Sequence, residues 1–300
     1  MYRVGFLGIA DAVTWASEVG ALRRGLRELG YEEGKNLVLE YRWAEGDFDR
    51  LPKLASELVK LNPDLIVTHS TPGSRAAKQA TTTIPVVIAA VGDPVRSGLV
   101  ASLARPGGNL TGNSIVEFDL GLKRLELVKE IVPNASHVAL LNVPGAQTGA
   151  AAESGARDLE AAGRSIGLRV TRVDIKESKD LERAFAAMAK ERTDAVIVRL
   201  DSLLAVHFDD IARLAIQYRL PTVGGTRSFV ESGGLSAYGA DIDEVYRHAA
   251  VYVDKILRGA KPADLPIAQP TKYILAVNLK TAGALGLTIP QSVLVRAEVQ

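Results

Sequence analysis

The sequence predicts an α/β protein of two Rossmann-like lobes, each with a parallel sheet and helices on both faces. Short apolar runs rich in β-branched residues alternate with segments whose leucines recur every three or four positions. The apolar runs are typical of strands buried on both faces, and the leucine spacing is typical of helices that pack on a sheet. Two such series of similar length follow one another, and 300 residues are enough for two medium domains.

The first series repeats a strand and a helix four times. Residues 3–9 are expected to form the first strand. A helix with leucines at three- and four-residue spacing follows it and ends at Gly30. Residues 36–43 alternate apolar and polar side chains, as a half-exposed strand does. Asp49 and Thr71 are expected to cap the next two helices. The other elements expected here are strands at 65–68 and 86–91, a short helix through Leu99, Val100 and Leu103, and an extended piece from Leu110.

The second series shows the same alternation, with its helices ended by glycine or proline. The expected strands are residues 137–141, 168–175, 195–200 and 221–225. The expected helices are residues 122–128, 149–166, 181–188, 206–218 and 245–257. The last helix could return to the first lobe, in which case the chain would cross between the lobes several times and form a hinge.

The stretch from Pro85 to Gly112 places a polar turn at the end of a buried strand. Gly92, Asp93 and Pro94 follow that strand directly. Ligands of open α/β sheets bind outside the carboxyl ends of the strands. Asp93 is therefore a candidate binding residue, although a carboxylate in this position could equally do no more than cap its own turn.

This stretch also resembles the signature of a family of ABC transporter substrate-binding proteins that includes tryptophan- and tyrosine-binding members. The resemblance rests on Val91-Gly92-Asp93-Pro94-Val95, then Ser97-Gly98-Leu99-Val100, then Arg105-Pro106-Gly107-Gly108-Asn109-Leu110-Thr111-Gly112. Residues 274–279, 284–287 and 289–290 are similar to the closing motif of the family. The resemblance implies the type I periplasmic-binding fold, whose two lobes are joined by three strands. The expected N-terminal lobe is then 1–115 plus 243–270, and the C-terminal lobe 116–242 plus 271–300.

Composition and motifs argue against several other classes of protein. The net charge is +1 and there is no long run of basic residues, so we expect no nucleic-acid partner. There are no cysteines, and the four histidines lack the spacing of metal ligands. The glycine pattern of a dinucleotide site and the serine elbow of a hydrolase are both missing. We therefore expect no catalytic activity, no cofactor and no metal. An enzyme on a doubly wound fold and the ligand-sensing lobe of a regulator are the alternatives.

The segment His69 to Ser74 joins a buried strand to a helix and is the best candidate for binding an anion. Thr71 and Pro72 suit the start of a helix, where free N–H groups and hydroxyls together can hold a carboxylate. The resemblance implies that Thr-Pro at this place faces the ligand, so Ser70 and Thr71 are candidates. Ordinary capping by Thr71 is the alternative.

Other candidates also follow predicted strands. Asp201 comes after its strand as Asp93 does, and either could pair with a ligand ammonium group or simply cap a helix. Trp15 could stack on a flat ligand or belong to the core. Arg227 could clamp a carboxylate or be an ordinary surface residue. At Asn142 the family usually has Asn followed by Ser, and this chain departs from that pattern. The remaining candidates are Ala10, Gln147, Thr148 and Gly225.

These observations predict the solute-binding component of an ABC importer. It would capture a small carboxylate between its lobes, an aromatic or apolar amino acid or a related aromatic acid, and present it to the membrane permease subunits. We expect a monomer. No apolar run is long enough to span a bilayer or to form a signal-peptide core. On residues alone, the protein is either cytoplasmic or a mature form whose export signal has been removed, and the resemblance implies a periplasmic or other extracytoplasmic location.

Overall fold

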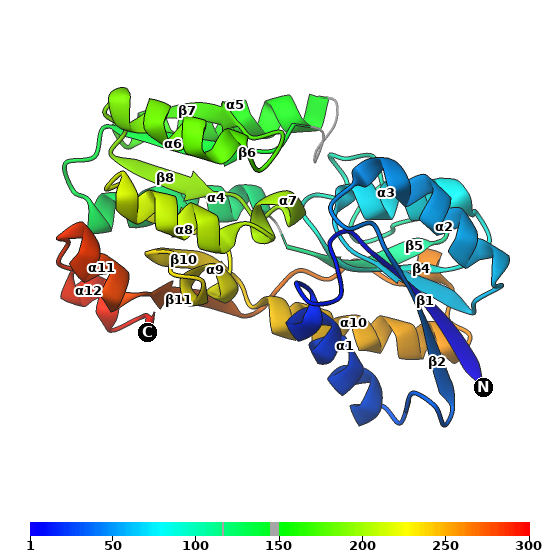
Figure 1. Ribbon diagram of the computed structural model, residues 1–300. Coiled ribbons are helices and arrows are strands. Elements are labelled where there is room, and N and C mark those ends of the chain that lie inside the picture. Colours follow the sequence, from blue (N-terminus) through cyan, green and yellow to red (C-terminus); the bar gives the residue numbers. More distant parts are fainter. Residues whose placement is uncertain (116, 145–149) are drawn as a thin grey trace. The chain divides into compact units, whose positions relative to one another are not determined.

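The computed structural model describes residues 1–115, 117–144 and 150–300. The chain divides into two compact units (Figure 1). Unit 1 comprises residues 1–116 and 242–271, and unit 2 comprises residues 117–241 and 272–300. The chain therefore passes from one unit to the other at three places. No helix among the described residues is both long and apolar enough to cross a membrane.

Unit 1 is built on a parallel sheet of five strands in the order β2-β1-β3-β4-β5. The inner strands are almost wholly buried because helices cover both faces, which explains their continuous apolar sequences. The strands are β1 (Tyr2–Gly8), β2 (Leu37–Trp43), β3 (Leu65–Thr68), β4 (Val86–Val91) and β5 (Leu110–Ser114).

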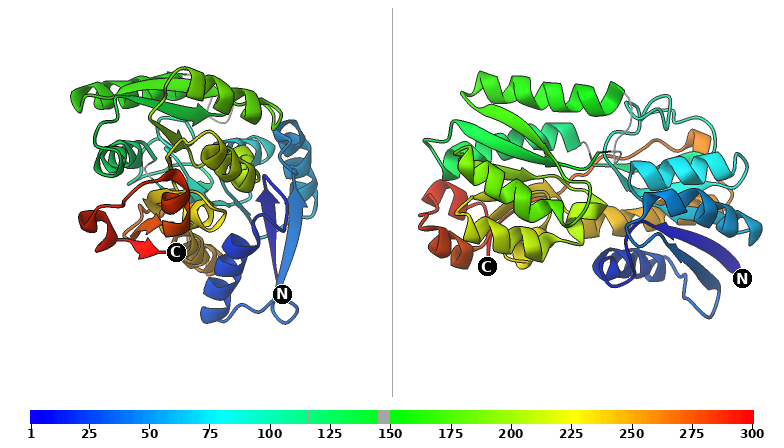
Figure 2. Two further views of the ribbon diagram at one scale, coloured as in Figure 1. Left: turned by 60° about the vertical axis from the view of Figure 1, so that its left-hand side comes forward. Right: turned by 45° about the horizontal axis from the view of Figure 1, so that its top comes forward.

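The helices of unit 1 lie as two pairs, one on each face of the sheet (Figures 1 and 2). α1 (Ala16–Glu28) and α10 (Ile242–Leu257) form one pair, and α2 (Leu51–Lys60) and α3 (Thr71–Ala80) the other. Two short 3-10 turns, η1 (Phe48–Arg50) and η2 (Pro262–Asp264), complete the unit. The core on one face joins leucines of α2 to Ile66 of β3 and Val86 of β4. α10 belongs to this unit although it lies more than 120 residues after β5 in the sequence.

Unit 2 contains a sheet of seven strands in the order β12-β11-β10-β9-β8-β6-β7. Neighbouring strands are parallel except β10 and β11, which pair antiparallel. The strands are β6 (His137–Asn142), β7 (Arg169–Asp174), β8 (Ala195–Val198), β9 (Thr222–Gly224), β10 (Ser236–Ala240), β11 (Tyr273–Val277) and β12 (Glu298–Val299). The helices are α4 (Glu117–Ile131), α5 (Ala150–Ser165), α6 (Asp180–Lys190), α7 (Ser202–Ala205), α8 (Phe208–Gln217), α9 (Arg227–Glu231), α11 (Leu279–Leu285) and α12 (Gln291–Leu294).

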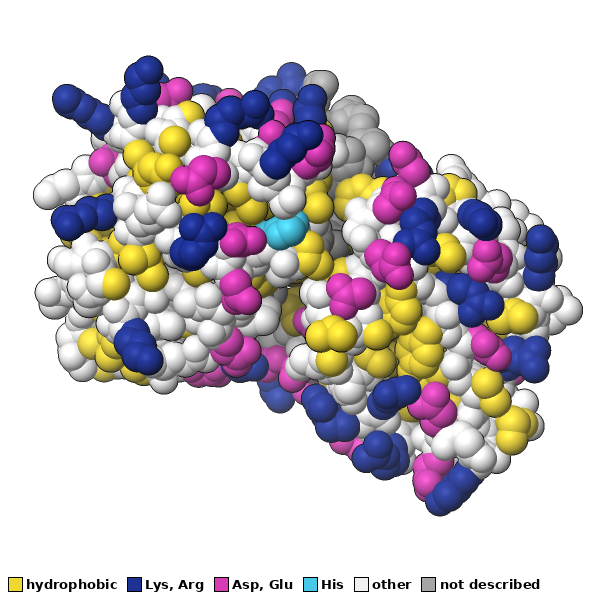
Figure 3. Space-filling view, in the orientation of Figure 1, with side chains coloured by type: hydrophobic (Ala, Val, Ile, Leu, Met, Phe, Trp, Pro, Cys, Tyr) yellow, Lys and Arg dark blue, Asp and Glu magenta, His cyan; other side chains and the backbone are white. Residues whose placement is uncertain are grey.

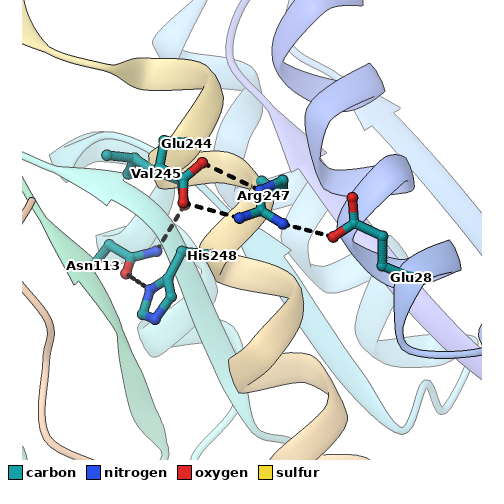
Figure 4. Close-up of polar contacts among 6 residues, drawn as sticks. All are labelled: Glu28, Asn113, Glu244, Val245, Arg247 and His248. Carbon is teal, nitrogen blue, oxygen red and sulfur yellow. Dashed lines mark hydrogen bonds and ion pairs between the residues drawn. The ribbon is translucent and has the colours of Figure 1, made fainter. Parts of the chain in front are cut away.

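A polar cluster in unit 1 links the segments that lead to and from unit 2 (Figure 4). The Asn113 amide on β5 donates to the carbonyls of Ala89 at 3.0 Å and Val245 at 3.1 Å, and its oxygen lies 2.8 Å from Nδ1 of His248. Because the amide nitrogen faces two carbonyls, its oxygen must accept, so Nδ1 of His248 carries a proton. Arg247 of the same helix binds Glu244 and Glu28, which ties α10 to α1.

Charges of both signs are interspersed on the face of the molecule shown in Figure 3. Lys and Arg side chains alternate there with Asp and Glu, and apolar side chains occur in small groups. This agrees with the balance of 36 basic and 35 acidic residues in the sequence.

Three local predictions are wrong. Two named the wrong N-cap residue, and one took a series of turns for a helix. Asp47, not Asp49, caps the turn before α2, since its carboxylate accepts the N–H of Asp49 at 2.9 Å. Ser70, not Thr71, is the N-cap of α3. The short helix through Leu99, Val100 and Leu103 is a series of turns instead. The N–H groups of Leu99 and Val100 both bond to the carbonyl of Pro94, and both side chains are buried in the core of unit 1.

Unit 2 differs from the sequence prediction in two further places. β8 ends at Val198 rather than at residue 200, whereas the helix expected at 206–218 is confirmed as α8, which the short helix α7 precedes. β10 was not predicted, because Ser236, Tyr238 and Gly239 do not form an apolar run. Its strand conformation comes from pairing with β9 and β11, which no local pattern encodes.

Candidate functional site

The carboxyl ends of β1 and β3 in unit 1 carry a closely packed aromatic cluster. His69 follows β3 and is almost fully buried, and its Nε2 accepts the N–H of Ile9 at 3.2 Å. Its ring stacks on Trp15 with 4.8 Å between ring centroids. Burial lowers the pKa of His69 to about 3, because the charged imidazolium would lose its hydration. His69 is therefore neutral, and it supports the loop rather than acting as a base.

Trp15 and Ala10 are core residues of unit 1. Trp15 is 8% exposed, and its Nε1 donates to the hydroxyl of Tyr246 at 2.8 Å. Ala10 is fully buried. In this structure, Trp15 therefore presents its ring to His69 and its N–H to Tyr246, and both contacts lie inside the unit.

The start of α3 keeps polar groups available. Ser70 has a φ of 60°, a strained conformation for a residue other than glycine, and such strain is concentrated at functional sites. Its hydroxyl reaches the N–H of Gly73 only at 3.5 Å. Thr71 is 6% exposed, and among the described residues neither its hydroxyl nor its N–H has a hydrogen-bond partner. The first turn of a ten-residue helix thus offers a hydroxyl and an N–H that a carboxylate could accept from.

Asp93 is occupied by its own turn. One carboxylate oxygen accepts the N–H groups of Val95 at 3.1 Å and Arg96 at 2.9 Å. The other oxygen lies 3.5 Å from Nε of Arg96, and the side chain is largely exposed. The capping alternative therefore describes the contacts that Asp93 makes here.

In unit 2, polar side chains from three neighbouring strands meet at the carboxyl edge of the sheet. The Asn142 amide at the end of β6 donates to Asp174 at the end of β7, over 2.7 Å. Its oxygen accepts from Nη1 of Arg199, which directly follows β8, at 3.2 Å. Arg172 forms an ion pair with Asp174 at 3.1 Å. The register explains this meeting, since Asn142 lies opposite Asp174 and Leu141 lies opposite Val198.

Asp201 lies beside this group and caps α7. Its Oδ1 accepts the N–H of Leu203 at 2.8 Å. Burial raises the pKa of Asp201, while the N–H of Leu203 and the positive charge of Arg199 act in the opposite direction and favour the carboxylate. Both carboxylates thus have a cationic neighbour, but burial acts on Asp201, whereas Asp93 and Arg96 are both partly exposed.

The other candidates in unit 2 have different surroundings. Gly225 follows β9, and a Cβ there would lie 2.8 Å from Nη2 of Arg124, so only glycine fits without displacing that side chain. Arg227 binds both carboxylate oxygens of Glu298, at 2.7 and 2.9 Å. Gln147 and Thr148 lie outside the described residues.

The structure therefore groups the candidates into two sets, one on each unit. Ser70 and Thr71 belong to the unit 1 set, and Asn142 and Asp201 to the unit 2 set. Sequence reasoning missed Arg199, because it was counted as part of a strand that ends one residue earlier. A charged residue directly after the buried run 195–198 was the signal that could have revealed it. No group of His, Cys, Asp and Glu that could hold a metal ion occurs in the part of the chain that the structure describes.

Comparison with known proteins identifies the family. A family model described as ABC transporter substrate binding protein matches residues 9–300. The chain belongs to this family. Its two-lobe α/β architecture is that of the type I periplasmic binding proteins. Family membership confirms the predicted fold class and the predicted role as the substrate-binding component of an ABC transporter.

Three relatives show how close the likeness is. A tyrosine-binding protein of Clostridioides difficile is 28% identical over 266 residues, which cover 88% of this chain and 75% of the relative. The crystal structure of a conserved domain protein from Vibrio cholerae matches with a TM-score of 0.92 and 33% identity, over 99% of both chains. The structure of an ABC domain from Streptococcus pneumoniae in complex with L-Trp matches with a TM-score of 0.91 and 26% identity, again over 99% of both chains.

Proposed function

We propose that this protein captures an aromatic or apolar amino acid, or a related aromatic acid, between its two units and delivers it to an ABC permease. The observation that carries the proposal is the family match over residues 9–300, together with two relatives whose names specify tyrosine and L-Trp as ligands. The ligand is held without a covalent step, so the protein is a carrier and not an enzyme. It works as a monomer outside the cytoplasm and binds no nucleic acid.

The start of α3 supports the carboxylate part of this proposal. Thr71 is buried, yet its hydroxyl and N–H have no partner among the described residues. The positive end of the helix dipole adds to these two donors and favours an anion at this place. A ligand carboxylate would satisfy both donors, and no arginine in unit 1 is needed.

A thermal-shift screen tests the proposal. The panel contains L-tryptophan, L-tyrosine, L-phenylalanine, L-leucine and indole-3-acetate, with glucose as a control ligand. A bound ligand raises the melting temperature by mass action, by an amount that grows with ligand concentration. Mass spectrometry of the recovered ligand should show it unchanged after incubation. If every acid at millimolar concentration leaves the melting temperature where glucose leaves it, the proposed ligand class is wrong. If a ligand is converted, the protein is an enzyme after all.

A further inference from the structure

Arg199 is a cation at the carboxyl edge of unit 2 that forms no ion pair with any carboxylate among the described residues. It directly follows β8 and is partly buried. Among the described residues, the guanidinium makes a single hydrogen bond, from Nη1 to the side-chain oxygen of Asn142 at 3.2 Å. Asn142 is neutral, and no carboxylate among the described residues lies within ion-pair distance of the guanidinium. Arginine has five N–H donors, so most of them are left for another partner.

The neighbouring contacts hold the guanidinium in place without neutralising it. The Asn142 amide nitrogen is engaged by Asp174 at 2.7 Å, which turns the amide oxygen toward Arg199. Asp174 is in turn paired with Arg172, an exposed residue earlier on β7. The negative charge of Asp174 is thus balanced by Arg172, and the positive charge of Arg199 is not balanced in this way.

Asp201 provides a negative charge two residues further along the chain. Its Oδ1 caps α7 through the N–H of Leu203 at 2.8 Å, and the N–H of Leu204 also favours the ionised carboxylate. Asp201 is close enough to Arg199 for the guanidinium to favour its ionised form, although the two side chains form no direct ion pair. The edge of unit 2 therefore presents a guanidinium that forms no ion pair among the described residues and, two residues further along the chain, a carboxylate.

We propose that Arg199 and Asp201 together recognise the charged head of an α-amino acid, Arg199 binding its carboxylate and Asp201 its ammonium group. An α-amino acid carries these two charges on one carbon atom, which matches a cation and an anion two residues apart. The inference rests on the proposed function and narrows it, because a related acid without an amino group would leave Asp201 unpaired. Hydrogen bonds between charged partners are about twice as strong as neutral ones, and a site that loses one of them discriminates strongly.

The test measures binding of three probes, L-tryptophan, indole-3-propionate and tryptamine, by isothermal titration calorimetry. Indole-3-propionate lacks the ammonium group and tryptamine lacks the carboxylate. The proteins are wild type, Arg199→Gln, Asp201→Asn and the matched control Arg172→Gln, which removes a cation from the same polar group. The melting temperature of each variant is measured without ligand, and binding is compared well below it.

The inference expects a different pattern of loss for each variant. Wild type should bind L-tryptophan at least tenfold more tightly than either analogue. Arg199→Gln should weaken L-tryptophan and indole-3-propionate at least tenfold and leave tryptamine unchanged. Asp201→Asn should weaken L-tryptophan and tryptamine and leave indole-3-propionate unchanged. Arg172→Gln should leave all three affinities within about twofold of wild type.

Two results would overturn the inference, and they can be told apart from failure of the proposed function. If Arg199→Gln binds L-tryptophan as wild type does, Arg199 does not contact the carboxylate. If Arg199→Gln lowers the affinity for all three probes equally, Arg199 is a structural support for Asn142. In both cases wild type still binds L-tryptophan and the proposed function stands. If wild type binds none of the probes or the amino acids of the thermal-shift panel, the proposed function fails and the inference fails with it.

Discussion

The carboxyl edges of the two sheets differ in the protonation states that their surroundings favour. In unit 1, burial favours the uncharged forms of His69 and of Glu18 on α1: the pKa of His69 is lowered to about 3 and that of Glu18 is raised to about 7, while Asp93 pairs with Arg96 in a partly exposed turn. Unit 2 gathers charged side chains at its edge, with Arg199 and Asp201 beside the pair formed by Arg172 and Asp174. Similar sheet architectures therefore carry two different kinds of edge.

The difference suggests a division of roles between the units. In the proposed function, the start of α3 in unit 1 would supply neutral donors, and unit 2 would supply the ionic contacts. A neutral helix start tolerates many carboxylates, whereas an ion pair of fixed spacing selects for an amino acid. Specificity for the charged head should therefore reside in unit 2. Four substitutions test or refine this comparison.

The largest expected effect is at a backbone contact in unit 2. A Cβ on Gly239 would lie 1.9 Å from the carbonyl oxygen of Gly225, so Gly239→Ala must push two strands apart. We expect a loss of about 3 kcal/mol of unfolding free energy or more, measured by urea denaturation. The comparison in unit 1 is Gly73→Ala, whose Cβ would meet the hydroxyl of Thr68 at 2.6 Å. Gly73→Ala would displace a side-chain atom rather than backbone, at the cost of the buried hydrogen bond from Thr68 to the carbonyl of Leu7 at 3.0 Å, so it should lose less, and an equal loss would contradict this comparison.

A second prediction concerns the uncharged carboxyl group in unit 1. Burial is the main reason that the pKa of Glu18 rises from its ordinary 4.5 to about 7, and the negative charge of Asp243 raises it slightly further. Its Oε2 is buried and has no hydrogen-bond partner. Between pH 4.5 and 7 the folded protein holds a proton that the unfolded chain releases, so this contribution to stability is lost as pH rises.

Glu18→Gln should therefore be more stable than wild type at pH 8, by about 3 kcal/mol, and nearly equal to it at pH 4.5. Chemical denaturation of both proteins at the two pH values provides the measurement. His69 contributes the opposite pH dependence, since its lowered pKa makes stability rise with pH up to about 6.5. It is present in both proteins and cancels from the difference. A difference between the proteins that does not change with pH would mean that Glu18 is charged throughout.

A third prediction tests whether the aromatic cluster of Trp15, His69 and Tyr246 stabilises unit 1 or contacts the ligand. Tyr246→Phe leaves the indole N–H of Trp15 buried without an acceptor, which should cost about 1 to 2 kcal/mol of unfolding free energy. Because both rings lie inside unit 1, ligand affinity should stay within about twofold of wild type. Tryptophan fluorescence reports both quantities, with Trp43→Phe as the background that leaves Trp15 as the single indole. A large loss of affinity with little loss of stability would make Trp15 a ligand contact.

The smallest expected effect on stability is at the start of α3. Thr71→Val keeps the shape of the side chain and removes a hydroxyl that makes no hydrogen bond among the described residues. We expect little change in stability and about a tenfold loss of ligand affinity, corresponding to one hydrogen bond to a carboxylate of about 1.5 kcal/mol. Asp93→Asn is the control in the same unit, because Asp93 is engaged by its own turn. If Asp93→Asn loses more affinity than Thr71→Val, the roles of these residues are reversed.

The sequence was sufficient to predict the elements that local patterns define. The buried runs of β3, β4 and β8, and the leucine spacing of α2, are continuous signals that the structure confirms. β10 was missed, because Tyr238 and Gly239 form a strand only through their neighbours. The short helix through Leu99 and Val100 was wrong, because those apolar side chains fill the core from a loop.

The candidate site was harder to predict than the fold. Position after a strand correctly pointed to polar side chains at the sheet edges, but it treated Asp93 and Asp201 as equivalent. They differ because Asp93 is paired with Arg96 in a partly exposed turn, whereas the carboxylate of Asp201 loses hydration near Arg199 without forming an ion pair with it. Burial and neighbouring charge depend on strands that are distant in sequence, so no local motif could distinguish the two residues.

A crystal structure of the protein grown with L-tryptophan tests the central claim most directly. The account predicts that Arg199 contacts the carboxylate of the ligand and that Asp201 contacts its ammonium group. Density for L-tryptophan that touches neither Arg199 nor Asp201 would contradict it.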